Sequence, residues 1–181
     1  AAAIAIGAGG LVGAFALAAY LVARRRHPVG NVSVPQPRKT VDLKQYLGRW
    51  YEIARYEQSF QKGCEGVTAD YGLRPDGSID VVNRCRKIGE NMSEARGRAR
   101  VVDKTTNAKL KVSFFGPFYG NYWVIDRGDD YSWAIVGEPS GRYLWILARQ
   151  ATPPAAEVRN LIERAQALGY DTSMLLLTRQ P

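Results

Sequence analysis

Few side chains in this sequence could perform acid–base or covalent chemistry. His27 is the one histidine and follows a run of arginines near the N-terminus, so we expect neither histidine-based catalysis nor histidine ligation of a metal or haem. Glu52 lies in a strand-like stretch, where a buried carboxylate needs a partner. It could make a structural ion pair or hydrogen bond, or it could orient a polar group of a ligand. The sequence therefore predicts no enzyme activity, no metal and no other cofactor.

Cys64 and Cys85 are the two cysteines of the chain. They flank a turn signal at 74–77, RPDG, so a hairpin would bring them together. A disulfide between them would indicate an oxidising compartment. Two free buried thiols would give the same pattern, and a free Cys64 would be the one candidate nucleophile.

The stretch GRWYEIARY at 48–56 begins a strand with Gly48 and then Trp50. Glycine tolerates a close backbone approach, and a tryptophan at a strand's start could plug the end of a structure rather than line a sheet. Arg149, far along the chain, is the candidate to cover this ring.

The N-terminal residues form a separate segment. Residues 1–23 are uncharged and almost all apolar or small, and as a helix they would just span a bilayer before Arg24, Arg25 and Arg26. We expect an uncleaved transmembrane anchor at 1–26 and a Pro-rich extended linker at 27–41. One domain follows at 42–181. Gly9 and Gly13 form a GxxxG pattern that could pack against another helix, although composition alone would also produce it.

The net charge of +8 is not spread evenly. Five of the 25 basic residues and none of the 17 acidic residues lie in 1–40, which leaves +3 for the rest. This small excess is scattered and accompanies no RNA-binding or zinc-finger motif, so we expect no nucleic-acid partner.

Short alternating segments bounded by turn signals recur about every ten residues after the linker. Consecutive antiparallel strands with short turns are typical of an up-and-down barrel, which has no open edges. We therefore predict an all-β, eight-stranded up-and-down antiparallel barrel with strands at about 50–56, 66–74, 78–85, 93–102, 108–115, 120–126, 131–137 and 142–149.

The alternation also indicates which face is inside. Along 93–101, small or apolar residues alternate with charged ones, and an inner face of small side chains would leave room for one ligand. The alternative is that Tyr71, Phe114 and Trp145 fill the interior completely.

One helix should pack on the outside of the barrel. It has Thr152 as the expected N-cap, an apolar stripe and a terminal Gly169. A last short strand is expected at 174–178.

With these elements in order, the chain resembles the lipocalin family. The motif GRWY at 48–51 looks like the family's first motif, VIDRGDDYSWAIVG at 124–137 like the second, and Arg149 in YLWILAR like the third. The stretches at 50–63, 110–122 and 143–149 look most like the bacterial outer-membrane lipocalins, apolipoprotein D and plant temperature-induced lipocalin. The resemblance implies that Trp50 closes the base of the barrel and that Arg149 lies over it, with Gly48 completing the motif.

The resemblance also implies a ligand and a location. These relatives are expected to hold fatty acids, lysophospholipids or similar single-chain lipids. Because no acylated cysteine follows the apolar segment, we expect a single-pass protein of the bacterial inner membrane. The positive-inside rule places the domain in the cytoplasm and the cysteines place it in the periplasm; we favour the periplasm and leave the cytoplasm open.

Strand parity and the family's inward positions together predict the ligand-binding residues: Ala54, Val67, Ala69, Tyr71, Ala95, Gly97, Val112, Phe114, Tyr122, Val136, Tyr143 and Trp145. Phe60 in the loop 57–66, and the aromatic residues of 113–120, are expected around the mouth.

Two functions fit these features. The first is a membrane-anchored carrier of a single-chain lipid or similar small hydrophobic ligand, for lipid storage, transport or membrane maintenance. The second is an accessory subunit held to a membrane-protein partner by its N-terminal helix.

Overall fold

A computed structural model describes residues 30–31, 33–87 and 89–180. The predicted anchor at 1–26, with Gly9 and Gly13, lies outside the described residues. Within the described ranges, no helix has the length and apolar character needed to cross a membrane.

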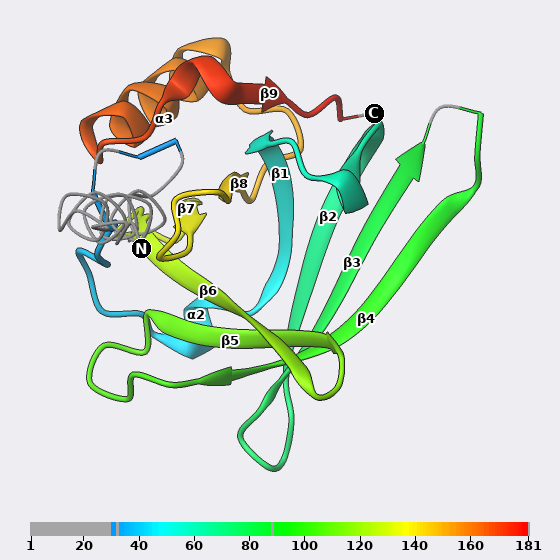
Figure 1. Ribbon diagram of the computed structural model, residues 1–181, viewed down its shortest axis with the longest axis vertical. Helices are drawn as coiled ribbons and strands as arrows, with labels where there is room; N and C mark the ends of the chain where they lie inside the picture. Colours follow the sequence, from blue (N-terminus) through cyan, green and yellow to red (C-terminus); the bar gives the residue numbers. More distant parts are fainter. Residues whose placement is uncertain (1–29, 32, 88, 181) are drawn as a thin grey trace, which may run out of the picture.

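The predicted eight-stranded antiparallel barrel is confirmed (Figure 1). Each strand pairs with the next, and β1 closes the barrel by pairing with both β8 and β2. The eight strands are β1 (Gly48–Tyr56), β2 (Cys64–Leu73), β3 (Ile79–Lys87), β4 (Met92–Val101), β5 (Lys109–Phe115), β6 (Phe118–Arg127), β7 (Trp133–Gly137) and β8 (Leu144–Ala148).

The C-terminal helix α3 (Ala155–Ala167) packs outside the barrel, as predicted (Figure 1). Its Leu161 and Ala165 are buried against the outer faces of β1, β6, β7 and β8. The expected N-cap was wrong: the cap is Pro154, without a side-chain hydrogen bond, so Thr152 lies outside the helix. The last strand, β9 (Leu175–Leu177), pairs with β1.

A bulge in β1 divides the side chains of this strand between two cores. Glu52 pairs with Leu147 and Ala54 with Ile146, so Ile53 is the extra residue. Both Ile53 and Ala54 consequently belong to the outer cluster beneath α3. The inward orientation predicted for Ala54 is therefore wrong, because strict alternation does not survive an inserted residue.

The base of the barrel is closed by the short helix α2 (Leu43–Tyr46) and by Trp50, which is fully buried. Trp50 Nε1 donates to the carbonyl oxygen of Tyr46 at 2.8 Å. Gly48 has a φ of +90°, a conformation that other residues avoid. Gly48 thus provides the backbone conformation at the start of β1, and Trp50 provides the side chain that fills the base.

Arg149 covers the outer side of this seal. Its Cζ lies 3.8 Å from the centroid of the Trp50 ring, which is a cation–π contact. Its guanidinium also donates to the backbone carbonyls at the end of α2 and the start of β1: Gln45 (2.7 Å), Leu47 (2.9 Å) and Arg49 (2.7 Å). Burial lowers the pKa of Arg149 below its usual value. One side chain thereby satisfies helix-end carbonyls that would otherwise lack donors.

Cys64 and Cys85 form a disulfide between β2 and β3, with their Cα atoms 5.4 Å apart. Both cysteines are thus bonded, so neither supplies a thiolate nucleophile.

We expect Arg149→Ala to lower the free energy of unfolding by about 3 kcal/mol, because it removes the contact with the Trp50 ring and leaves several backbone carbonyls without a hydrogen-bond donor. Urea unfolding of the purified protein would measure this loss. Arg159→Ala, an exposed change on α3, is the matched control and should shift stability by less than about 0.5 kcal/mol. Equal losses in the two variants would contradict the role given to Arg149.

Candidate functional site

The interior of the barrel is packed at its base and accessible toward the other end. Near the base, Ile79, Val81 and Ala99 are buried on the inner face. Ala95 lies on the same inner face of β4, because Gly97 pairs with the inward-facing Val81 and Ala95 is two residues from Gly97. Ala95 is nevertheless exposed. Solvent therefore reaches the upper inner wall.

The wall itself is incomplete beside this region. Hydrogen-bonded pairing between β4 and β5 covers only Arg98–Val101 and Leu110–Ser113. In the described part of the chain, 92–97 of β4 pair with β3 alone. We call this stretch of β4, which has no β5 partner, the slot; β4 diverges from β5 there (Figure 1).

The predicted lining residues, Ala54 excepted, divide by depth. Val136 is fully buried in the core at the base, and Tyr71 and Tyr122 pack against that core. Ala69 and Val112 are half-buried, Val67 is buried, and Ala95 is exposed. These positions follow from the register of the strands, and whether a ligand touches them stays a prediction.

Phe114 occupies part of the space that small residues on β4 leave. A Cβ atom added to Gly97 would meet Phe114 Cδ1 at 2.8 Å, so the ring lies directly over the glycine. At this level the ring covers Gly97 but is itself 36% exposed, so it takes up only part of the interior, and Ala95, higher on the strand, remains open.

The loop between β1 and β2 forms a partial lid over the mouth through the 3-10 turn η1 (Ser59–Gln61). Phe60 stacks on Tyr143, and Tyr143 stacks on Trp145, with centroid distances of 6.5 and 5.6 Å. Trp145 Nε1 donates to Gln61 Oε1 at 2.9 Å. Three aromatic rings and one amide therefore connect the lid to β8.

A buried ion pair lies beneath this lid. Arg55 Nη1 donates to Glu52 Oε1 at 2.8 Å, and the two side chains are 1% and 3% exposed. Thr178 Oγ1 donates to the same carboxylate at 2.5 Å, and Gln61 Nε2 donates to its other oxygen at 2.9 Å. Arg55 Nη2 donates to the Gln61 carbonyl at 3.1 Å. Of the two roles considered for Glu52, this arrangement favours the structural ion pair.

Three phenol groups form the polar part of the floor. Tyr71 Oη donates to Tyr122 Oη at 2.9 Å, and Tyr46 Oη lies 2.7 Å from Tyr122 Oη. Burial raises the pKa of Tyr71 to about 12 and the pKa values of Tyr46 and Tyr122 well above their usual range, so all three are neutral at pH 7. Sequence analysis missed Tyr46; its spacing of four residues from Trp50 was the available signal.

Exposed aromatic side chains lie at the β5–β6 hairpin, at the open end of the barrel. Phe115 and Phe118 are 82% and 77% exposed. Arg100 lies over the Tyr119 ring at 4.7 Å, and Lys111 pairs with Arg100 across β4 and β5. Next to the slot, the tip of the β5–β6 hairpin is therefore aromatic, and the outer faces of β4 and β5 are basic.

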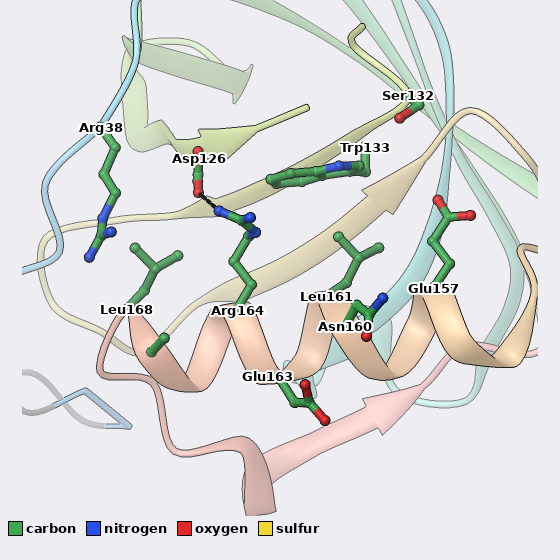
Figure 2. Close-up of a pocket in the computed structure, with 11 residues that line it drawn as sticks. Arg38, Asp126, Ser132, Trp133, Glu157, Asn160, Leu161, Glu163, Arg164 and Leu168 are labelled. Atoms are coloured by element: carbon green, nitrogen blue, oxygen red, sulfur yellow. Dashed lines mark hydrogen bonds and ion pairs between the residues drawn. The ribbon is translucent and has the colours of Figure 1, made fainter. Parts of the chain in front are cut away.

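A separate groove of about 800 Å³ lies outside the barrel along α3 (Figure 2). Arg164 crosses it, pairing with the buried Asp126 at 2.9 Å and lying 5.0 Å from the Trp133 ring. Its other walls are mostly polar or charged, including Arg38 and Glu157. These contacts attach the helix to the barrel and are remote from the inner face.

We expect Glu52→Ala to cost about 3 kcal/mol of folding free energy, because it leaves the Arg55 guanidinium buried without its carboxylate. Glu57→Ala is the matched control: it contacts the same guanidinium at 3.5 Å from a 42% exposed position and should cost less than about 1 kcal/mol. Chemical denaturation measures both. A Glu52→Ala variant of unchanged stability but reduced ligand affinity would instead favour the ligand-orienting role.

Comparison with known proteins agrees with this architecture. The lipocalin-like domain family matches residues 41–180. The chain is 43% identical to outer membrane lipoprotein Blc of Vibrio cholerae, over 83% of this chain and 91% of that protein. It is 29% identical to mouse apolipoprotein D, over 84% of each chain. Among solved structures, insecticyanin from Manduca sexta superposes with a TM-score of 0.67 at 19% identity, covering 86% of this chain and 88% of that one.

These relatives correct the predicted location. The Blc protein of Escherichia coli, also named an outer membrane lipoprotein, is 40% identical over 93% of this chain and 95% of its own. A single-pass protein of the inner membrane conflicts with this relationship. The predicted inner-membrane location was wrong, because the similarity to outer membrane lipoproteins extends over nearly the full length of both chains.

The family match over residues 41–180, the Trp50–Arg149 seal and the barrel with its outer helix agree with one another. The chain belongs to the lipocalin family, and it is a binding protein for small hydrophobic ligands rather than an enzyme.

Proposed function

We propose that this lipocalin binds a single-chain lipid, such as a fatty acid or lysophospholipid, inside its barrel. The observation that carries the proposal is the exposed inner face at Ala95 above a closed apolar base. A lipid chain there would gain about 25 cal/mol for each Å² of apolar surface removed from water. The predicted lining residues would supply that surface, with Ala54 now excluded.

Basic side chains at the mouth suit a negative head group. Lys62, just before β2, and Arg86 and Lys87, at the end of β3, are exposed where the barrel opens, alongside the exposed Glu57 and Glu90. A carboxylate or phosphate held there would stay partly hydrated, so its charge would not have to be buried.

We also propose that the lipid is taken from a membrane through the slot beside the β5–β6 hairpin. The exposed Phe115 and Phe118 suit insertion at a bilayer interface, and Arg100 with Lys111 suits an anionic lipid surface. By analogy with the relatives named above, this membrane is the outer membrane. The disulfide agrees with an oxidising compartment. The accessory-subunit function depended on residues 1–26, and no contact in the described residues favours it.

Ala95→Trp should weaken binding of a dansylated fatty acid at least about tenfold, because the new ring would occupy the accessible part of the interior. Fluorescence titration of the full chain, kept soluble in amphipol, measures the affinity, and native mass spectrometry detects lipid that co-purifies. Ala156→Trp, at an exposed position of α3, is the matched control and should bind as the wild type does. Equal binding by the two variants, or none by the wild type, would contradict the barrel as the binding site.

Replacing Phe115 and Phe118 with serine should slow uptake of the same fatty acid from phosphatidylglycerol-containing vesicles by roughly tenfold, because two interfacial anchors are lost. The equilibrium affinity should stay within about twofold of wild type. Stopped-flow fluorescence measures the uptake rate. Val102→Ser, an exposed apolar position near the closed end, is the control. An unchanged uptake rate in the double variant would exclude this route of entry.

A further inference from the structure

The three phenols of the floor come from three different elements and meet at Tyr122. Tyr46 belongs to α2, Tyr71 to β2 and Tyr122 to β6. The Tyr122 oxygen lies 2.7 Å from that of Tyr46 and 2.9 Å from that of Tyr71. The three rings also pack together: the Tyr71 centroid lies 5.7 Å from that of Tyr46 and 6.0 Å from that of Tyr122.

This arrangement leaves one proton without an acceptor. Three neutral phenols carry three O–H donors, and two hydrogen bonds within the group use two of them. Among the described residues, no other hydrogen bond is made by these hydroxyl groups. The third donor must therefore point either into protein or into the barrel.

Burial decides between these directions. Tyr46 is 4% exposed, so an unused donor on its hydroxyl would be enclosed without a partner, which is costly. Tyr122 faces inward and is half-buried rather than buried, and Tyr71 already donates to it, so Tyr122 is the phenol whose own donor can point inward. The favoured arrangement has Tyr46 and Tyr71 both donating to Tyr122. Tyr122 then directs its own proton into the barrel.

We propose that the Tyr122 hydroxyl determines specificity by donating to a neutral oxygen at the inner end of the ligand. This inference rests on the proposed function, because it concerns the same interior. A hydrocarbon end would displace water from the phenol and leave its donor unpaired, whereas a hydroxyl or carbonyl oxygen would replace that water. A carboxylate is a poor fit at this depth, since one donor does not compensate a buried charge. The ligand class is an apolar chain that carries an uncharged oxygen at its inner end.

The test compares fatty acids with their ω-hydroxy counterparts: decanoate, dodecanoate, tetradecanoate and hexadecanoate, each measured by displacement of the dansylated fatty acid from the full chain in amphipol. At the chain length that reaches the floor, the wild type should bind the ω-hydroxy compound roughly tenfold more tightly. The Tyr71→Phe/Tyr122→Phe double variant should lose this preference. Both sites are changed together because the Tyr71 hydroxyl alone could take over the donation.

Two further variants make the result specific. Tyr71→Phe should keep the preference, whatever it does to overall affinity, because Tyr46 still donates to Tyr122. Tyr51→Phe makes the same chemical change on the outer face of β1 and should also keep it. Thermal unfolding checks that each variant is folded. Equal affinities for both compounds at every length in the wild type, or a preference that survives in the double variant, would overturn the inference and leave lipid binding intact. If no fatty acid displaces the probe, the proposed function fails as well.

Discussion

One inserted residue in β1 determines which side chains of this strand face the barrel interior and which pack beneath α3. Ile53 opens a bulge between Glu52 and Ala54, so the strand changes which face it buries halfway along its length. Before the bulge, Trp50 closes the base of the interior. After it, Ala54 and Tyr56 lie in the core beneath α3, while Arg55 faces the interior beside its partner on β8. A regular strand of nine residues could not contribute side chains to the base, to the buried polar cluster and to the outer core in this way.

The same bulge explains why a charged pair is buried near the mouth. It places Glu52 and Arg55 on one face, and the C-terminal segment completes the wall where β2 no longer pairs with β1. Thr178 donates to Glu52, and Gln180 Nε2 donates to the backbone carbonyls of Glu52 and Val67 at 2.7 and 3.0 Å. Because Gln61 of the lid bonds to the same carboxylate, lid, wall and tail form one hydrogen-bonded unit.

The interior that results is asymmetric. Its base combines an apolar cluster with three neutral phenols, and its upper wall opens beside β4 with aromatic residues at the tip of the neighbouring hairpin. An amphiphile matches such a gradient from enclosed to wet, because its chain can be buried while its head group stays near solvent. The outer groove along α3 has the opposite character: it is spanned by the Arg164–Asp126 ion pair and holds two parts of the protein together.

Much of this architecture follows from the sequence alone. Alternating segments and turn signals determined eight strands to within a few residues, and the apolar stripe determined a helix on the outside, because both patterns are periodic and local. The contact between Trp50 and Arg149 was predicted from the resemblance of three ordered motifs to the lipocalin family, and the structure contains it. Tertiary structure alone decided which way Ala54 faces, since strict alternation along 50–56 puts apolar residues and a charged residue on each face and does not reveal the inserted Ile53. It also decided the partners of Glu52 and the meeting of Tyr46 with Tyr71 and Tyr122, because contacts between distant segments depend on register and closure of the barrel rather than on local spacing.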